Sequence, residues 1–246
     1  MPTTFQNAPE VSEEDLELDR LRRTFEGRSR SPLAQRYSRM NPGHLHALHE
    51  REATMAALLR SASLRSLAGL RILDVGCGKS ATLRQYLEYE ADPARLCGVD
   101  LLPEFTQKAK SASPHLHIAC ASASNLPFAN CSFDFVSQFM LFTSVLSAAL
   151  KSQIAREIDR VLAPGGRLLW YDFAFDNPSN ANVRGIRLAE VHRLFPHFSM
   201  TSRRITLAPP FGRAIGHLGP TINYVASKIR FLCTHYLCLL QKRQPM

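Results

Sequence analysis

The stretch ILDVGCGKSATL at residues 72–83 decides the fold of this chain of 246 residues. It is a short apolar run that contains an acid, Asp74, and leads into a turn with glycines at Gly76 and Gly78. A glycine turn between a strand and a helix lets a ligand approach the backbone, while the start of the helix offers free N–H groups. The stretch therefore predicts a nucleotide-type site, with Ser80 or Thr82 able to cap the helix that follows.

Strands and helices alternate around this stretch. We expect strands at 71–75, 95–100, 115–120, 132–139 and 167–173, and helices at 81–89, 103–111, 147–162 and 187–195. This alternation predicts a Rossmann-like, doubly wound α/β fold, in which helices cover both faces of a mostly parallel sheet in three layers. Two more strands, at 203–208 and 234–241, flank a basic insert rich in Pro and Gly. They predict an antiparallel pair at one edge of the sheet.

The domain organisation follows from composition along the chain. Residues 1–40 are predicted to be an N-terminal arm, partly disordered or acting as a lid, because an acidic cluster and then arginines occur there with few large apolar residues. Residues 41–246 are predicted to form a single domain. It would begin with an amphipathic helix at 43–63 and carry a helical insert at about 209–232.

The overall composition is that of a folded globular protein, with 45% hydrophobic and 21% charged residues. The formal charge of +9 favours acidic partners, such as phosphorylated substrates, nucleic acid or an anionic membrane surface. Because the N-terminus lacks a basic start followed by an apolar stretch, we expect no secretory signal and a cytoplasmic protein. The six cysteines show no CxxC pair and are predicted to be reduced thiols of the core.

The most apolar C-terminal stretch is INYVASKIRFLCTHYLCLL at 222–240. It is interrupted by Lys228, Arg230 and His235, which disfavours a membrane span. A segment that lies on a surface remains open.

Two classes of cofactor compete for the glycine turn. A dinucleotide site needs GxGxxG, but here the third glycine is missing after Gly76 and Gly78. Asp100 lies 24 residues after Gly76 (100 − 76), near the position of an acid that contacts a ribose, and this suits both classes. Asp74 separates them, because its charge beside the ligand should repel a pyrophosphate and hold an ammonium or sulfonium group. This favours S-adenosylmethionine.

Four motifs carry a family resemblance: DVGCGKS at 74–80, GVDLLPE at 98–104, NLPFANCSFDFVSQ at 125–138 and EIDRVLAPGGRLLWYDF at 157–173. In this order they resemble the class I S-adenosylmethionine-dependent methyltransferases, most closely the broad type 11 group that acts on small molecules. The resemblance covers about residues 70–175.

The resemblance implies roles for individual residues. Around the methionine moiety it places Asp74, Gly76, Cys77 and Gly78, with Asp100 on the ribose hydroxyls and Leu101 against the adenine. Ser122 and Ala123 stand near the adenine amino group, where the family usually has an acid, and Ser80 replaces the usual third glycine. Gln138 and Phe139 would face the methyl group and the acceptor. Tyr37 would be a lid residue.

The catalytic candidate is Asp172, at the carboxyl end of the strand at 167–173, where the cleft of such a sheet lies. His192 on the next helix is the weaker candidate for a base. We expect no metal site, because His44, His46 and His49 do not match a zinc spacing. A polar or anionic acceptor could be recognised by side chains from two later segments: Asn177, Asn180, Arg184, Arg204 and Arg213.

Three functions remain open from the sequence. The first is a methyltransferase that acts on a small molecule, anionic or sugar-containing, most simply at oxygen. The second is an RNA or protein methyltransferase, which the positive charge allows, although no NPPY-type tetrapeptide or RNA-binding module is visible. The third is a catalytically silent relative that uses the fold as an interaction scaffold, as the replacements at Ser80 and Ser122 suggest.

Overall fold

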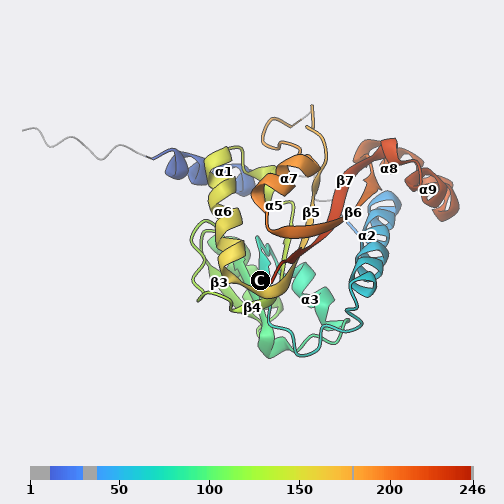
Figure 1. Cartoon of the computed structure of the whole chain (residues 1–246). Helices are drawn as coiled ribbons and strands as arrows, with labels where there is room; N and C mark the ends of the chain where they lie inside the picture. The colour runs from blue at the N-terminus through green and yellow to red at the C-terminus, as the bar shows by residue number, and fades with distance from the viewer. Residues whose placement is uncertain (1–11, 30–37, 179, 245–246) are drawn as a thin grey trace, which may run out of the picture.

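The computed structural model describes residues 12–29, 38–178 and 180–244 (Figure 1). Seven strands form one sheet in the order β3-β2-β1-β4-β5-β7-β6. Their bounds are β1 Ile72–Val75, β2 Leu96–Asp100, β3 His117–Cys120, β4 Phe133–Phe139, β5 Leu162–Phe173, β6 Phe198–Leu207 and β7 Cys233–Lys242. The first five strands in this order pair in parallel, whereas β7 is antiparallel to both β5 and β6. The predicted Rossmann-like fold with an antiparallel edge is confirmed.

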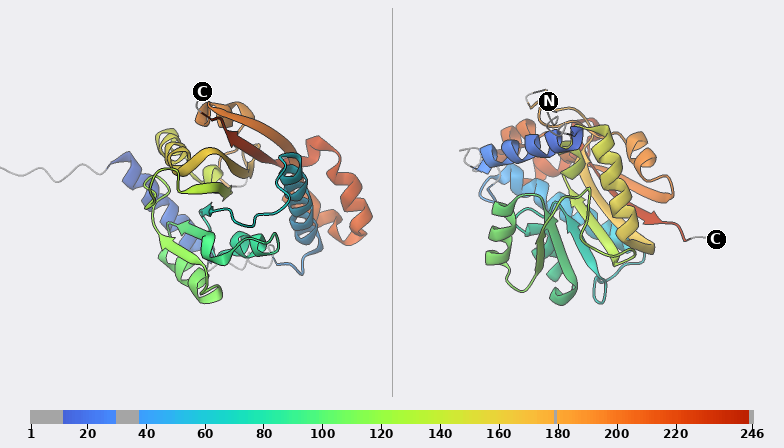
Figure 2. Two further views of the ribbon diagram at one scale, coloured as in Figure 1. Left: turned by 60° about the horizontal axis from the view of Figure 1, so that its bottom comes forward. Right: turned by 90° about the vertical axis from the view of Figure 1, so that its left-hand side faces the viewer.

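The helices cover both faces of the sheet (Figures 1 and 2). Their bounds are α1 Glu13–Ser29, α2 Pro42–Ser61, α3 Ala81–Leu87, α4 Pro103–Ala112, α5 Leu141–Ser144, α6 Ala148–Val161, α7 Leu188–Leu194, α8 Pro209–Ile215 and α9 Pro220–Ser227, with short 3₁₀ turns at Pro93–Arg95, Gly216–Leu218 and Arg230–Leu232. None of the helices in the described ranges has the length and apolarity that crossing a lipid bilayer requires.

Two apolar cores lie on opposite faces of the sheet. One packs α6 and α7 against the strands through residues such as Ile158, Trp170 and Phe195. The other packs α2 and α3 through residues such as Leu58 and Tyr86. Each helix thus buries its apolar stripe against the sheet, which is the basis of the three-layer arrangement.

The observed elements differ from the predicted ones in three places. The Pro164–Gly165–Gly166 segment is an irregularity inside β5 and not a turn ahead of it, because Leu162 already pairs with Phe133 before the register shifts. The strand β6 begins at Phe198, five residues earlier than predicted (203 − 198), and pairs with β7 along its length. The short helix α5 was not predicted.

The cysteine prediction was wrong in part. All six thiols are free, and Cys77, Cys233 and Cys238 are buried, but Cys120 at the end of β3 and Cys131 in the turn before β4 are exposed. The prediction failed for these two cysteines because apolar neighbours in the sequence do not ensure that a side chain points into the core.

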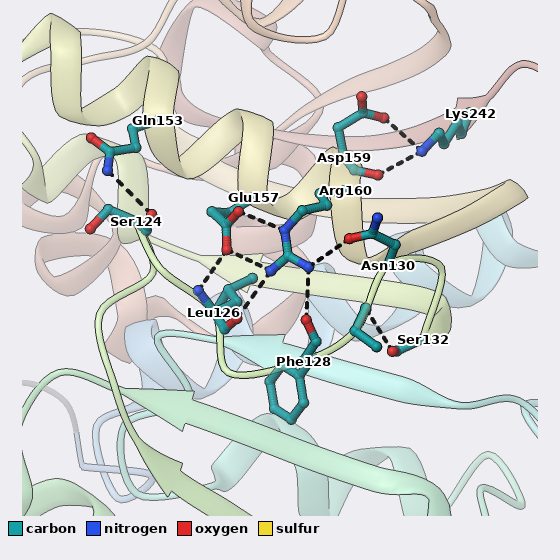
Figure 3. Close-up of polar contacts among 11 residues, drawn as sticks. Ser124, Leu126, Phe128, Asn130, Ser132, Gln153, Glu157, Asp159, Arg160 and Lys242 are labelled. Atoms are coloured by element: carbon teal, nitrogen blue, oxygen red, sulfur yellow. Dashed lines mark hydrogen bonds and ion pairs between the residues drawn. The ribbon is translucent and has the colours of Figure 1, made fainter.

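The loop that follows β3 is held in place by α6 (Figure 3). The guanidinium of Arg160 donates to the carbonyl oxygens of Leu126 and Phe128 at 3.0 and 2.7 Å, and it pairs with Glu157. Glu157 also accepts a hydrogen bond from the Leu126 backbone N–H at 2.7 Å. The hydrogen bonds from Arg160 hold the pKa of Glu157 below its usual value. These contacts fix the loop at Leu126 and Phe128, a few residues after Ser122 and Ala123.

The helix α1 docks on the domain through its acidic side chains. Glu17 accepts hydrogen bonds from the backbone N–H groups of Leu146 and Ser147 and from Arg20. Arg20 in turn donates to the carbonyl oxygen of Ser144 at 2.6 Å. The acidic cluster therefore attaches a helix of 17 residues to the fold. The division of the chain into an arm at 1–40 and one domain stays a prediction.

Candidate functional site

A cavity of about 690 Å³ opens at the carboxyl ends of the parallel strands. In a doubly wound sheet this is the edge at which ligands bind. The wall on one side comes from the turn after β1, the end of β2, the loop after β3 and α1. The wall on the other side comes from α2, β5, β7 and α8.

The structure brings most of the predicted cofactor residues to this cavity. Its wall includes Gly76, Gly78, Asp100, Leu101, Ser122 and Ala123. Four other predicted residues lie behind the wall and do not line the cavity: Asp74, Cys77, Gln138 and Asp172. Tyr37 lies outside the described residues.

The glycine turn directs its backbone N–H groups toward β2. Those of Gly76 and Cys77 donate to the carbonyl oxygen of Val99 at 2.8 and 2.9 Å. The N–H of Gly78 donates to Asp100 Oδ2 at 2.8 Å. Positive φ angles of 75° and 54° at the two glycines allow this path. Because all three N–H groups already have acceptors, the turn offers none of them to a pyrophosphate.

Asp100 ends β2 with its carboxylate fixed by the backbone on both sides. Oδ1 accepts from the Leu102 N–H at 2.9 Å, and Oδ2 accepts from Gly78. Burial raises the pKa of Asp100, and these backbone hydrogen bonds oppose the rise. Each carboxylate oxygen keeps a second lone pair. The side chain can therefore accept hydrogen bonds from ligand hydroxyls in the cavity.

Asp74 is only 2% exposed, and its Oδ1 accepts a hydrogen bond from the Ser137 hydroxyl at 2.6 Å. Burial raises its pKa to about 7, although the Ser137 hydrogen bond opposes the rise. The nearby charge of Asp100 raises the pKa further, whereas Arg51 lowers it. The carboxyl is thus poised between its two protonation states near neutral pH.

Ser122 belongs to a short chain of polar contacts that reaches α1. Its hydroxyl lies 2.7 Å from the hydroxyl of Ser124, which donates to Glu14 Oε1 at 2.6 Å. The acid that the family usually has in this segment is absent from the loop itself. The carboxylate nearest to this chain of contacts is that of Glu14 on α1, which accepts from Ser124 and does not line the cavity.

Ser80 occupies a left-handed conformation, with φ 61° and ψ 23°, at the start of α3. The predicted cap is not formed, because its hydroxyl makes no hydrogen bond to the first turn of the helix. The hydroxyl donates to the Lys79 carbonyl oxygen at 2.7 Å and accepts from Arg84 at 2.8 Å. Ser80 therefore keeps the backbone path of a glycine, with strain that its hydrogen bonds offset.

The side chains of Asp172 and Gln138 are hydrogen-bonded to each other. Gln138 Nε2 donates to Asp172 Oδ2 at 2.8 Å, and the Thr143 backbone N–H donates to Oδ1 at 3.0 Å. Burial raises the pKa of Asp172 to about 6, against the effect of these hydrogen bonds. Gln138 Oε1 accepts from the Leu141 N–H at 3.1 Å. The pair fixes the segment after β4, and a role of Asp172 as a base stays a prediction.

Arg51 of α2 stands in the opposite wall of the cavity. Its guanidinium carbon lies 5.1 Å from the ring centre of Phe139 and 5.3 Å from that of Tyr171. In the described part of the chain, no carboxylate forms an ion pair with it. Packing on two aromatic faces holds the cation in position while its N–H groups remain available.

His235 is a cavity residue that the sequence did not single out for function. Its ring stacks on Tyr171 at 4.8 Å with an interplanar angle of 4°, and its Nδ1 lies 3.0 Å from the Thr234 hydroxyl. Burial, followed by the charge of Arg51, lowers its pKa to about 3, so the imidazole is neutral. His235 reaches the cavity because it pairs with Phe173 in the register of β5 and β7. The only signal in the sequence was a histidine near the start of the largely apolar β7.

The other predicted residues divide between the cavity and the surface. Asn177, Asn180 and Arg213 line the cavity, as do His44 and His46. Arg184, Arg204, His49 and His192 do not, and His192 is exposed. Over the described ranges, no three His, Cys, Asp or Glu side chains are grouped so as to hold a metal ion.

Comparisons with known proteins agree with this geometry. The family model described as a methyltransferase domain matches residues 73–170. No curated protein sequence is significantly similar to the chain. Many solved structures share its fold.

Three of these structures illustrate the likeness. The Burkholderia thailandensis 1,6-didemethyltoxoflavin-N1-methyltransferase, solved with 1,6-didemethyltoxoflavin and S-adenosylhomocysteine, is 18% identical, with 97% of this chain and 94% of that chain covered and a TM-score of 0.59. An S-adenosylmethionine-dependent methyltransferase from Mesorhizobium loti is 18% identical, with coverages of 77% and 98% and a TM-score of 0.56. The YcgJ protein from Bacillus subtilis is 16% identical, with coverages of 79% and 100% and a TM-score of 0.58.

The family match covers the turn after β1, all of β2, β3 and β4, and most of β5. Identities this low show a common fold alone. The matched domain and the common fold confirm the resemblance to the class I S-adenosylmethionine-dependent methyltransferases that the four sequence motifs indicated.

Proposed function

We propose that this chain, which matches a methyltransferase family model at residues 73–170 and resembles the class I S-adenosylmethionine-dependent methyltransferases, transfers a methyl group to an oxygen atom of an anionic small molecule. The cofactor half of the cavity is the one lined by Gly76, Gly78, Asp100 and Leu101. The acceptor half is the one lined by Arg51, Tyr171 and His235.

The residues of the cofactor half suit S-adenosylmethionine. Asp100 would bind the ribose hydroxyls, Leu101 would lie against the adenine, and Ser122 and Ala123 would lie at its edge. Asp74 would balance the ammonium and sulfonium charges from behind the turn of Gly76, Cys77 and Gly78. Gln138 would support the region of the methyl group.

The N–H groups of Gly76, Cys77 and Gly78 already have acceptors within the protein, and this supports the choice of S-adenosylmethionine over a dinucleotide. A pyrophosphate would meet backbone donors that already serve Val99 and Asp100, and it would lie near the buried Asp74. A cationic ligand needs no such donors and is attracted by both acids.

The main observation that supports an anionic acceptor is the position of Arg51. Its charge lines the cavity, and no carboxylate of the described residues forms an ion pair with it, although Arg51 lies close enough to the buried Asp74 to lower the pKa of that carboxyl. The side chains of the acceptor half that can bear charge are Arg51, Arg213, His44, His46 and His235. None of them is acidic, so a carboxylate, phosphate or phenolate group on the acceptor would be the natural counter-ion.

The size of the cavity favours a small molecule. Its volume of about 690 Å³ lies within the range of about 300–1,000 Å³ that is usual for small-molecule sites. The structurally similar Burkholderia thailandensis enzyme was solved with bound 1,6-didemethyltoxoflavin, a small molecule, and S-adenosylhomocysteine. A folded RNA or a protein chain would have to pass α1 and α2, which both contribute to the wall.

When bound, S-adenosylmethionine supplies a methyl group that is already activated, so the protein has to align the acceptor oxygen and exclude water. An oxygen that is already ionised needs no base. For a hydroxyl acceptor, the neutral imidazole of His235 could accept a hydrogen bond and orient it. Asp172 remains the candidate base of the sequence prediction, and its carboxyl, which now accepts hydrogen bonds from Gln138 and Thr143, would have to turn toward the cavity to take the proton of a hydroxyl.

The test is a methyl-transfer assay with labelled S-adenosylmethionine and fractionated small-molecule extract, followed by mass spectrometry of the labelled product. We expect a methyl ester or methyl ether of an acid. A label found only in RNA or protein would support the second candidate from the sequence. Failure to bind the cofactor at millimolar concentration in calorimetry would support the silent scaffold. Action in the cytoplasm is part of the same proposal.

A further inference from the structure

The segment between β6 and β7 carries most of the exposed apolar side chains that the structure describes. Ten large hydrophobic residues are exposed in the described ranges, and seven of them lie between 211 and 231. These seven, which we call the insert face, are Phe211, Leu218, Ile222, Tyr224, Val225, Ile229 and Phe231, with Phe231 76% exposed. Single exposed apolar residues are common, but a gathering of this kind marks an interaction surface.

The helix α9 has an inverted polarity. It buries the polar side chains of Asn223 and Ser227 and exposes Tyr224 and Val225, which are 58% and 59% exposed. Two of the buried polar groups have partners within the insert, since Asn223 Nδ2 donates to the Gly219 carbonyl oxygen at 3.0 Å and Ser227 Oγ donates to the Tyr224 carbonyl oxygen at 2.8 Å, whereas Asn223 Oδ1 has no partner among the described residues. A helix in water places its apolar side inward. The outer side of α9 is therefore suited to contact with an apolar phase.

The charge of the insert is of one sign. Residues 209–232 contain no Asp or Glu, and Lys228, Arg230 and His217 are all exposed. Lys228 Nζ lies 4.3 Å from the ring centre of Tyr224, so a basic group and an aromatic ring share one patch. Within the described part of the chain, neither Lys228 nor Arg230 forms an ion pair. The whole chain has the same bias, with a formal charge of +9.

The insert lies at the outer end of the molecule. Figures 1 and 2 show α8 and α9 projecting beyond the edge of the sheet, on the side of α2. Its inner residues pack on a small apolar core that includes Leu207 and Cys233. A projecting element can reach a flat surface without interference from the rest of the fold.

We propose that the insert face docks on the surface of an anionic lipid bilayer. Aromatic rings and aliphatic side chains would enter the boundary between headgroups and acyl chains, while Lys228 and Arg230 would contact anionic headgroups. A second copy of the chain suits the face less well, because a symmetric contact would bring Lys228 and Arg230 close to their own copies. The inference does not depend on the proposed acceptor, since no step of it uses the cavity.

The test uses the full chain in sedimentation with vesicles of phosphatidylcholine, alone or mixed with phosphatidylserine. Two variants probe the face: a triple change of Tyr224→Ser, Val225→Ser and Phe231→Ser, and a double change of Lys228→Gln and Arg230→Gln. Met40→Ser is the control, because Met40 is 90% exposed but lies outside the insert. Circular dichroism and cofactor binding check that each variant is folded.

We expect the natural chain and the control to sediment with the anionic vesicles only. The charge variant should partition about thirtyfold more weakly, which corresponds to about 1 kcal/mol for each basic residue. The triple variant should lose binding. The proposal is overturned if the natural chain does not sediment with anionic vesicles, or if it binds neutral vesicles equally well. It is also overturned if both variants bind anionic vesicles as strongly as the natural chain does. A dimer in sedimentation velocity that the triple variant dissociates would also overturn it, in favour of a second copy.

Discussion

The hydroxyl of Ser137 donates a hydrogen bond to Asp74 Oδ1 at 2.6 Å, between the neighbouring strands β4 and β1. The two residues are direct partners in the register of the parallel pair. This contact fixes the acid behind the glycine turn in a fully buried position, where its pKa is raised to about 7.

A first prediction concerns the pH dependence of cofactor binding. A cationic ligand binds the ionised form of Asp74, and the empty protein holds that carboxyl partly protonated near pH 7. The affinity for S-adenosylhomocysteine, which keeps the ammonium group, should therefore fall as the pH drops below about 7. Isothermal calorimetry on both sides of this pH measures it.

Asp74→Asn provides the matched variant for that measurement. It should bind the ligand weakly, with little dependence on pH in the same range. Whereas its affinity for the ligand should fall, the free energy of unfolding of Asp74→Asn should rise above that of the natural chain. A carboxyl with a raised pKa in the folded state loses stability as the pH rises from its unfolded value toward about 7. The variant should thus resist denaturant better than the natural chain at pH 8. Tight binding by Asp74→Asn would contradict the assignment.

A second prediction concerns the left-handed residue Ser80. Ser80→Ala keeps the strained φ of 61° and removes the hydrogen bonds with Lys79 and Arg84. It should lower the free energy of unfolding by about 1–3 kcal/mol. Ser80→Gly loses the same hydrogen bonds but relieves a strain of about 1–2 kcal/mol, so it should cost less. Urea unfolding of the two variants checks the order, and an alanine variant more stable than the glycine variant would refute it.

A third prediction concerns the docking of α1. Burial alone would raise the pKa of Glu17, but hydrogen bonds from Arg20, Leu146 and Ser147 lower it overall. Since Leu18 and Leu21 of the same helix line the cavity, loosening α1 should open the cofactor half. Glu17→Gln should weaken cofactor binding by roughly tenfold, the effect of about 1.4 kcal/mol from charge-assisted hydrogen bonds.

Asp19→Asn is the control for Glu17→Gln. Asp19 pairs with Arg23 on the exposed side of α1, where both side chains are at least half exposed. Ion pairs of this kind contribute little. Calorimetry should therefore find the natural affinity in Asp19→Asn, and equal losses in the two variants would show that the docking contacts of Glu17 are not the cause.

The sequence predicted the fold because its signals are local. The apolar runs of β1, β2, β4 and β5, each followed by a helical pattern, lie within 72–173, and the glycine turn marks the carboxyl edge of the sheet. The positions of Gly76, Gly78 and Asp100 in the cavity follow from that topology alone. These parts could be predicted without any knowledge of distant contacts.

The acceptor half could not be predicted in the same way, because it depends on contacts between distant segments. His235 reaches the cavity since β7 inserts between β5 and β6 and places it opposite Phe173, 62 residues earlier (235 − 173). Arg51 is one charged residue among several on α2, and only its packing on Phe139 and Tyr171 distinguishes it. The docking of α1 through Glu17 likewise depends on a segment 129 residues away.

The proposed recognition of an anionic acceptor is tested most directly by the methyl-transfer rate of Arg51→Gln. Arg60→Gln is its matched control, because Arg60 lies exposed near the end of the same helix. The acceptor in the extract is first classified by its retention on an anion-exchange resin. We expect that it is retained, and that Arg51→Gln lowers kcat/KM by roughly tenfold to a hundredfold, the effect of about 1.5–3 kcal/mol from a charged hydrogen bond. Binding of S-adenosylhomocysteine should be unchanged in Arg60→Gln, and at a pH well above 7, where Asp74 is ionised in either case, it should be close to the natural affinity in Arg51→Gln. An acceptor that passes through the resin, or an Arg51→Gln variant as active as the natural chain, would contradict the account.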